Sequence, residues 1–407
     1  MDDDHVSLDH ADVFIAGAGP VGCATAHAFA DQGWTVLMVD AFDPPTPRPT
    51  AEMVFPPAVE LLDRWGVELP PGRSVRGTGV TLYEHGGGDP VELRFPPDAQ
   101  PLVTPYPDLV EAMRESLMER DGVEMLYGVQ VLSVELDGSV HTTRGTSDTQ
   151  FRADLLVGAD GRWSAVRHRL YGEVGQAVTS HTASVMLEGT GLTGYEQARV
   201  ITDERGRCAR VHAMGRDLLG IALDLPEERP PDDDVRAYVE KHYVPMLPPE
   251  LHDPLLRVAS EPERITWSGE GIRLRHTYEH GRIAMVGDAV GHQHPLLGID
   301  FTMGVGDALC LAKYGRANGY DRARPEDSAG IEYAARHFFE ALTARKPETV
   351  GVRRLLWEQL RSSPAAREAA MRLFSVDVRA TGLVPVFNVL EEYRERQEAD
   401  ASSADPS

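Results

Sequence analysis

The sequence contains few of the residues that form disulfides and metal sites. Only three of its 407 residues are cysteines, namely Cys23, Cys208 and Cys310, and no two of them form a Cys-x-x-Cys pair. This spacing excludes a disulfide framework and a cysteine-type zinc site, and predicts reduced packing residues in a cytoplasmic protein. His292 and His294 stand beside no further cluster of cysteine or acidic residues, so no metal site is predicted.

Basic residues are also scarce. The formal net charge is −24 at pH 7, and Lys241, Lys313 and Lys346 are the only lysines. Because no basic patch stands apart, nucleic acid is excluded as a partner, and an anionic membrane surface is disfavoured. The acidic start Met1–His5 lacks the basic and apolar segments of a secretory signal, and no apolar run approaches the ~20 residues of a membrane helix. We therefore expect a globular protein without an integral membrane segment.

What the sequence does contain is a glycine-rich turn between an apolar strand and a helix. The apolar run 13–16 leads into Gly17-Ala18-Gly19-Pro20-Val21-Gly22, and an apolar helical face follows. In such a turn Gly17 permits the tight bend, Gly19 lets the backbone approach a pyrophosphate, and Gly22 allows close helix packing. The helix that opens at Pro20 directs free N–H groups and the positive end of its dipole at the phosphates. The pattern predicts a bound dinucleotide.

The kind of dinucleotide follows from the next acidic residue. Asp40 lies 18 residues after Gly22, at the end of a second strand. A carboxylate there accepts hydrogen bonds from ribose hydroxyls and repels a 2′-phosphate, which favours FAD or NAD over NADP. A second glycine pattern, Gly189–Gly194, has the same spacing but no apolar helical face and no suitably placed acid after it. We interpret it as a loop, so the chain offers one dinucleotide site and not the two of a disulfide reductase.

Two later segments are buried strands that end in an acidic turn. The first, Leu155–Arg167, carries Gly158-Ala159-Asp160-Gly161 and leads into a helix, where Asp160 could equally be a helix cap. The second, Gly281–Ala289, ends in Gly287-Asp288, and His294-Pro295-Leu296-Leu297-Gly298 and another helix follow it. Each segment is weak evidence alone, but the order and spacing of the three motifs together are specific.

With these three motifs the sequence resembles the para-hydroxybenzoate hydroxylase-like (class A) flavoprotein monooxygenases over residues 12–310. That family carries an N-terminal Gly-x-Gly-x-x-Gly, a middle Asp-Gly segment, and a late Gly-Asp segment followed by Pro-x-x-Gly. The run His294–Met303 is most similar to the squalene-epoxidase-like branch. The resemblance implies an α/β fold in which a Rossmann-like FAD-binding domain is interleaved with an antiparallel-sheet substrate domain and followed by C-terminal helices.

The alternation of strand and helix patterns places the boundaries of these parts. The expected ranges are 1–75, 104–178 and 276–320 for the FAD-binding domain, 76–103 and 179–275 for the substrate sheet, 321–397 for the helical region, and 398–407 for a disordered tail. The C-terminal helices either cover the active site or make a homodimer contact, and the sequence leaves both open.

The resemblance also implies roles for individual residues. The residues implied to bind FAD non-covalently are Gly17, Gly19, Pro20, Gly22 and Asp40 at the ADP half, Asp160, Gly287 and Asp288 at the middle, and Pro295 and Gly298 at the isoalloxazine ring. Asp160 is further linked to the transient visit of NAD(P)H, the co-substrate. The candidate catalytic residues are those of the loop at the ring, His294, Pro295, Gly298 and Asp300. Arg210 and His212 are candidate substrate contacts, although an alternating strand could equally turn them to solvent.

The sequence departs from the family at three places. It has Gly287-Asp288-Ala289-Val290-Gly291 where the family has Gly-Asp-Ala-Ala-His, and Tyr106-Pro107 where an arginine often precedes the middle helix. Gly298-Ile299-Asp300 replaces Gly-Gln-Gly, and this change matters most. A carboxylate at Asp300 beside the flavin pyrimidine would disfavour the anionic reduced flavin unless it is protonated or turned away.

The leading hypothesis is an FAD- and NAD(P)H-dependent monooxygenase that uses O₂ to hydroxylate or epoxidise a hydrophobic small molecule. An aromatic, polyketide-like or polyene substrate of secondary metabolism would lie at the junction of the two domains. The cofactor carries the chemistry, while the protein positions it and excludes water. The alternative is an FAD-dependent enzyme of the same fold without net oxygenation, a cyclase or a dehydrogenase, which Asp300 favours.

Overall fold

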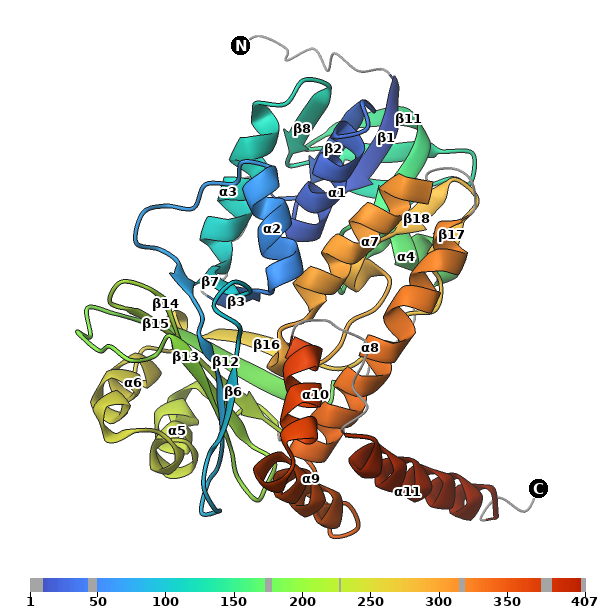
Figure 1. Ribbon diagram of the computed structural model, residues 1–407. Coiled ribbons are helices and arrows are strands. Elements are labelled where there is room, and N and C mark those ends of the chain that lie inside the picture. Colours follow the sequence, from blue (N-terminus) through green and yellow to red (C-terminus); the bar gives the residue numbers. More distant parts are fainter. Residues whose placement is uncertain are drawn as a thin grey trace.

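Two large sheets with their helices, a small connecting sheet and a group of C-terminal helices form the described part of the protein (Figure 1). The computed structural model describes residues 10–42, 50–172, 178–226, 228–314, 319–374 and 383–403. In Figure 1 the first sheet, with the N-terminal strand, lies in the upper half, and the second sheet and the last helices lie in the lower half. The predicted α/β fold with a Rossmann-like part is confirmed.

The first sheet has eight strands around a parallel core. Its strands are β1 (His10–Ala16), β2 (Val36–Asp40), β8 (Val123–Tyr127), β9 (Gln130–Val134), β10 (Ser139–Arg144), β11 (Ser147–Gly158), β17 (Glu279–His280) and β18 (Ile283–Met285). The order is β17-β18-β11-β1-β2-β8, with β10 and then β9 attached beside β11. β1 lies in the middle, with Val13 opposite both Val36 and Leu155 in parallel pairs.

Helices cover one face of this sheet. They are α1 (Pro20–Ala30), α2 (Pro56–Arg64), α3 (Tyr106–Met118) and α7 (Asp300–Tyr314), while α4 (Ala165–Tyr171) packs near β9. Apolar residues of β1 and β2 lie in one core with these four helices and in a second core on the other face. Because both faces are buried, these strands read in the sequence as continuous apolar runs.

The second sheet has seven strands in the order β16-β12-β15-β14-β13-β5-β6. Its strands are β5 (Gly79–Glu84), β6 (Val91–Arg94), β12 (Ser180–Glu188), β13 (Gln197–Thr202), β14 (Cys208–Gly215), β15 (Leu218–Leu225) and β16 (Thr266–Glu270). All neighbours are antiparallel except β13 and β5, which come from separate parts of the chain and pair in parallel. The segment 189–194 is a loop, as predicted.

The two faces of the second sheet have different partners. Odd-numbered residues of β12 and β15, such as Val185 and Ile221, pack against α5 (Val235–His242) and α6 (His252–Ala259). The even-numbered residues, such as Ser180 and Asp224, occupy the opposite face because strand side chains alternate. We call this opposite side the inner face. A small sheet of β3 (Ala51–Val54), β7 (Leu102–Pro105) and β4 (Val75–Arg76) connects the two large sheets, and Ala51 packs close to Gly220.

In the described residues from 319 onward, four helices share a core with β5 and β6. They are α8 (Tyr320–Leu342), α9 (Val350–Ser362), α10 (Pro364–Phe374) and α11 (Val384–Ser403). The prediction of a disordered tail from residue 398 was wrong up to Ser403, where α11 continues through helix-forming residues such as Glu398 and Ala399. Residues 404–407 lie outside the described part.

The predicted domain boundaries stay a prediction, although the strands sort in agreement with them. Strands of the first sheet all come from 1–75, 104–178 and 276–320, and strands of the second from 76–103 and 179–275. Among the described residues no helix is both long enough and apolar enough to cross a bilayer. In the same part of the chain, no three His, Cys, Asp or Glu side chains gather in a way that could hold a metal ion.

Candidate functional site

The glycine-rich turn between β1 and α1 is tightly packed at two of its three glycines. Gly17 has φ +107°, and a Cβ there would lie 2.5 Å from the Ala159 carbonyl oxygen. A Cβ at Gly22 would lie 1.9 Å from the Gly17 carbonyl oxygen. No side chain fits either place, so these two glycines are required by the fold itself.

Gly19 is different, because the space beside it is open. A Cβ there would meet only the Tyr106 hydroxyl, at 3.9 Å. Gly19 is also the N-cap of α1, where no side chain caps the helix and no acidic residue lies in the first turn. Pro20 follows with the φ that a first helical turn needs. Free N–H groups and open space at a helix N-terminus fit a pyrophosphate.

Asp40 is held in place by the turn and by a buried arginine. Its Oδ2 accepts a hydrogen bond from the Ala18 N–H at 2.9 Å and lies 3.4 Å from Nη2 of Arg114. Arg114 of α3 also donates from Nε to the Ala18 carbonyl at 2.7 Å. Arg114 is 5% exposed, and we did not predict it as a site residue. Its only signal in the sequence was its place next to Met113, on the apolar side of the helix.

Asp160 caps the helix that follows it. Its Oδ2 accepts from the N–H groups of Ala165 and Val166, at 2.6 and 3.1 Å, in the first turn of α4. Its Oδ1 is buried and has no hydrogen-bond partner among the described residues, and burial raises the pKa of this carboxyl. The hydrogen bonds of Asp160 to the first turn of α4 agree with the helix-cap interpretation, whereas the role of Asp160 toward FAD and NAD(P)H stays a prediction.

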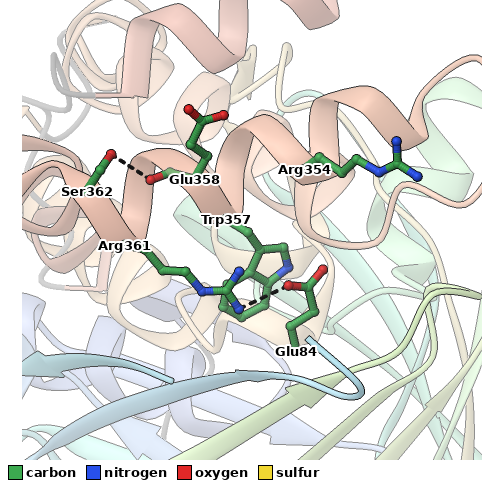
Figure 2. Close-up of a pocket in the computed structure, with 6 residues that line it drawn as sticks. All are labelled: Glu84, Arg354, Trp357, Glu358, Arg361 and Ser362. Carbon is green, nitrogen blue, oxygen red and sulfur yellow. Dashed lines mark hydrogen bonds and ion pairs between the residues drawn. The ribbon is translucent and has the colours of Figure 1, made fainter. Parts of the chain in front are cut away.

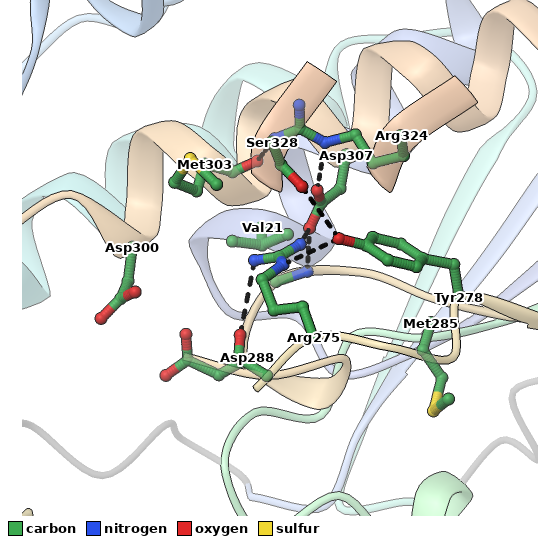
Figure 3. A network of polar contacts seen from close by, with 12 residues as sticks. Val21, Arg275, Tyr278, Met285, Asp288, Asp300, Met303, Asp307, Arg324 and Ser328 are labelled. Carbon is green, nitrogen blue, oxygen red and sulfur yellow. Dashed lines mark hydrogen bonds and ion pairs between the residues drawn. The ribbon is translucent and has the colours of Figure 1, made fainter. Parts of the chain in front are cut away.

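A buried ionic network holds the Gly287-Asp288 turn from behind (Figure 3). Asp307 of α7 lies between Arg275 and Arg324, and it is fully buried. Its Oδ1 accepts from Arg324 Nε at 2.6 Å, and its Oδ2 accepts from the Gly287 N–H at 2.7 Å as well as from Arg275. Gly287 opens the short helix η5 (Gly287–Ala289), so the network fixes the position of the backbone just before Asp288.

Helices α1 and α7 cross closely behind this turn. A Cβ at Gly304 would lie 2.4 Å from Cγ2 of Val21, and a Cβ at Gly287 would lie 3.0 Å from its Cγ1. The first and the last predicted FAD motifs therefore meet at one side chain, which is the arrangement that a single dinucleotide site requires.

Charged side chains gather where the isoalloxazine ring is expected. Figure 3 shows the carboxylates of Asp288 and Asp300 pointing toward one another. Asp288 lies 3.2 Å from Arg162 Nε, and Asp300 Oδ1 accepts from the Gln293 N–H at 2.9 Å. Arg162 also pairs with the buried Glu270 of β16. The carboxylates of Asp288 and Glu270 thus share Arg162 at this end of the site.

Two acids of this cluster hold protons more tightly than usual. Burial and the charge of Asp288 raise the pKa of Asp300 to about 7. Burial and the charge of Asp300 raise the pKa of Glu52, on β3, to about 8. Asp300, which we predicted at the ring, is therefore accompanied by a second acid, Glu52. We did not predict Glu52, because only the folded chain brings β3 to this place.

The loop 292–298, which we call the ring loop, is bonded to the inner face of the second sheet. His294 lies 2.8 Å from Ser180 Oγ, and the Pro295 carbonyl accepts from Arg210 Nη1 at 2.7 Å. Pro295 opens the short helix η6 (Pro295–Leu297), and Gly298 ends it with φ +66° and open space where a Cβ would lie. The structure therefore brings His294, Pro295 and Arg210 together.

His212 lies two residues beyond Arg210 on the same strand and the same face. It is 8% exposed, its Nε2 has no hydrogen-bond partner among the described residues, and burial lowers its pKa to about 3. His212 is buried and Arg210 is half-buried, so neither side chain is fully exposed to solvent. Their contact with a substrate stays a prediction.

A surface pocket lies at α9, which Figure 1 shows at the lower end of the molecule, and Figure 2 shows the side chains that line it. It has a volume of about 500 Å³ and is lined by Glu84, Arg354, Trp357, Glu358, Arg361 and Ser362. Arg361 pairs with Glu84 at 3.0 Å and covers the Trp357 ring, so the pocket wall is tied by internal contacts. α9 and the end of β5 form it, and no predicted site residue lines it.

Comparison with known proteins agrees with this geometry. Residues 10–314 match the family described as "FAD binding domain", so the chain belongs to that family, a class of flavin-dependent monooxygenases. The sequence is 25% identical to para-nitrophenol 4-monooxygenase of Pseudomonas sp. (strain WBC-3), over 74% of this chain and 76% of that protein. It is 24% identical to squalene epoxidase of Schizosaccharomyces pombe, over 76% of this chain and 70% of that protein.

The fold is shared with solved structures. The crystal structure of PqsL from Pseudomonas aeruginosa in complex with 2-aminobenzoylacetate superposes with a TM-score of 0.70 at 21% identity, covering 84% of this chain and 99% of that one. Together with the family match, this confirms the predicted resemblance to FAD-dependent monooxygenases.

Proposed function

We propose that the protein uses FAD, NAD(P)H and O₂ to hydroxylate or epoxidise an aromatic, polyketide-like or polyene small molecule of secondary metabolism. The observation that supports this most directly is the bond from Arg210, on the inner face of the second sheet, to Pro295 of the ring loop. A substrate at that junction would lie between the sheet and the flavin, where water can be excluded.

The chain's own residues have defined tasks in this proposal. The N-terminus of α1 and Gly19 bind the pyrophosphate, Asp40 accepts from the ribose, and Asp288 accepts from the ribityl chain. Asp160 serves FAD binding and the visit of NAD(P)H, and Pro295 and Gly298 line the ring. When bound, FAD supplies the redox chemistry that activates O₂.

A second candidate is an FAD-dependent enzyme of this fold without net oxygenation, such as a cyclase or dehydrogenase. The observation that favours it is the acid at Asp300, in the first turn of α7, together with Glu52. Ionised carboxylates at the ring disfavour extra negative charge on the cofactor, so this candidate requires a pH above the raised pKa values of the two acids, about 7 for Asp300 and about 8 for Glu52. A cytoplasmic location and a homodimer contact through the C-terminal helices also belong to the proposal.

The experiment compares product formation with and without air. The purified protein is expected to be yellow, to consume NAD(P)H faster when substrate is added, and to give a product heavier by one oxygen atom. A product formed without O₂ and without NAD(P)H would point to the second candidate.

The ribityl assignment is tested by a matched pair of variants. Asp288→Ala is expected to lose FAD during gel filtration, because its carboxylate faces the cofactor. Asp154→Ala removes a surface carboxylate that pairs with Arg282 at 3.2 Å and is expected to retain FAD. An Asp288→Ala protein that stays fully loaded contradicts the assignment.

A further inference from the structure

A buried hydrogen-bond relay joins the ring loop to the second sheet. His294 Nε2 lies 2.8 Å from Ser180 Oγ of β12, and that oxygen lies 2.9 Å from Asp224 Oδ1 of β15. The three residues are 1%, 5% and 3% exposed. We call these three side chains the relay, and it runs from the ring loop to the inner face without contact with solvent.

The partners fix the place of every proton in the relay. The Leu296 N–H donates to His294 Nδ1 over 3.2 Å, so Nδ1 is an acceptor and carries no proton. In a neutral imidazole the proton is then on Nε2, which donates to Ser180 Oγ. The Ser180 hydroxyl keeps its own proton and donates it to Asp224. A second proton on the ring would oppose the Leu296 N–H and break the loop contact.

The relay is not a nucleophilic triad, although it contains the same three residue types. In a nucleophilic triad the serine donates to the histidine, and the acid holds the histidine from its other nitrogen. Here Ser180 bonds both His294 Nε2 and Asp224, and His294 Nε2 also lies 3.5 Å from Asp224 Oδ1. The Leu296 N–H occupies the other ring nitrogen. Burial of Ser180 also closes it to any substrate.

Two further contacts hold the same loop. The His294 ring stacks on Phe339 of α8, with centroids 4.0 Å apart and planes 15° apart. The Pro295 carbonyl accepts from Arg210 of β14. The ring loop thus takes its position from three strands of the second sheet and from the C-terminal helices, and not from the first sheet alone.

We propose that Ser180 and Asp224 are positioning residues, which through His294 fix where the ring loop holds the flavin relative to the substrate face of the sheet. The proposal rests on the proposed function only in that the ring loop meets the flavin ring. We place neither residue at the cofactor, so the proposed effect passes through His294 and Leu296. A misplacement of about 1 Å is enough to slow a reaction roughly 100-fold.

The test uses three variants of the FAD-loaded protein. Ser180→Ala removes both bonds of the serine, whereas Asp224→Asn keeps an acceptor oxygen for it. Thr202→Val is the matched control, since Thr202 is a buried inner-face hydroxyl without a hydrogen-bond partner among the described residues. The readouts are the absorption and fluorescence of the flavin, kcat and KM for the substrate, and the nitrogen chemical shifts of the His294 imidazole.

Ser180→Ala is expected to bind FAD, to change the flavin spectrum and to lower kcat by roughly 10- to 100-fold while KM stays within about twofold. Asp224→Asn and Thr202→Val are expected to match the unaltered protein. An unchanged spectrum and kcat in Ser180→Ala would overturn the proposal, and so would a proton on Nδ1 of His294. If Ser180→Ala does not fold, the test is the position of the His294 proton in the unaltered protein: a proton on Nε2 supports the proposal, and a proton on Nδ1 overturns it.

Failure of the proposed function gives a different result. If the protein forms no oxygenated product at all, the monooxygenase proposal is refuted. The flavin spectrum of Ser180→Ala and the nitrogen chemical shifts of His294 still test the relay.

Discussion

Arg114 Nη2 lies 3.4 Å from Asp40 Oδ2, behind the glycine-rich turn and almost out of contact with solvent. Arg114 also bonds the Ala18 carbonyl, so one guanidinium ties the acid of β2 to the turn that precedes α1. A buried pair of this kind is costly to break, because the remaining carboxylate loses its ionic partner and keeps only backbone N–H donors.

Replacing Arg114 is therefore expected to weaken both the fold and FAD binding. Arg114→Met should lower the free energy of unfolding by about 3 kcal/mol and reduce the FAD retained after gel filtration. The control is Arg120→Met, which removes a more exposed pair with Asp31 and should cost at most about 1 kcal/mol. Equal melting temperatures and equal FAD contents for the two variants would contradict the role of Arg114.

The glycines of the turn are expected to separate folding from binding. Gly19→Ala should leave the melting temperature of the FAD-free protein unchanged and weaken FAD binding by roughly tenfold or more, about 1.4 kcal/mol, because the new methyl group takes pyrophosphate space. Gly22→Ala should destabilise the FAD-free protein itself by at least about 1–3 kcal/mol, since its Cβ overlaps the Gly17 carbonyl. Calorimetry and FAD titration measure the two effects. A Gly19→Ala protein with unaltered FAD affinity argues against a pyrophosphate at this place.

The acid at Asp300 predicts a particular dependence of stability on pH. Its pKa in the folded chain is raised to about 7, so between about pH 4 and pH 7 the folded state binds a proton that the unfolded state has released. Stability therefore falls as the pH rises through this window. Asp300→Asn should make the free energy of unfolding fall less between pH 5 and pH 8 than it does in the unaltered protein, as measured by urea unfolding. Glu52→Gln should act in the same direction, because its pKa is raised as well. Identical pH profiles for Asp300→Asn and the unaltered protein would show that the acid is ionised throughout.

The network around Asp307 is expected to support the Gly287-Asp288 turn. Asp307→Ala leaves Arg275 and Arg324 without their shared carboxylate and Gly287 without an acceptor, and should cost about 3–5 kcal/mol of stability. Asp307→Asn keeps an acceptor for Gly287 and should cost less. Glu368→Ala, which removes an exposed pair with Arg372, should change stability by at most about 1 kcal/mol. Thermal unfolding ranks the three variants, and the reverse order would refute the network's role.

The parts of the site that lie within one local motif were predicted from the sequence. The contact at Gly22 and the helix cap at Asp160 are local, because each depends on residues a few positions away. The bend at Gly17 is also part of the motif, although the residue that crowds it, Ala159, comes from the end of the neighbouring strand β11. The resemblance to a known family extended this to the order of the sheets, and the family match confirms it.

The residues that sequence reasoning missed depend on contacts between distant segments. Arg114, Glu52 and Asp224 each reach the site from an element whose own sequence pattern says only strand or helix. Asp307 lies on the helix that the sequence predicts after the ring loop, but its two arginines come from elsewhere in the chain. Such partners are set by tertiary packing, which no local spacing encodes.

The close approach of Val21 to Gly287 and Gly304 also lets us predict when the cofactor can bind during synthesis. The ribosome makes the pyrophosphate turn early and the helix that closes behind it nearly 300 residues later, a delay of roughly 15–60 s at ordinary elongation rates. Until α7 emerges, α1 lacks one of the two helices that pack against it, since α3 is made early and α7 late. We therefore expect the chain to bind its cofactor late in synthesis, although the glycine-rich turn that predicts the cofactor is made first.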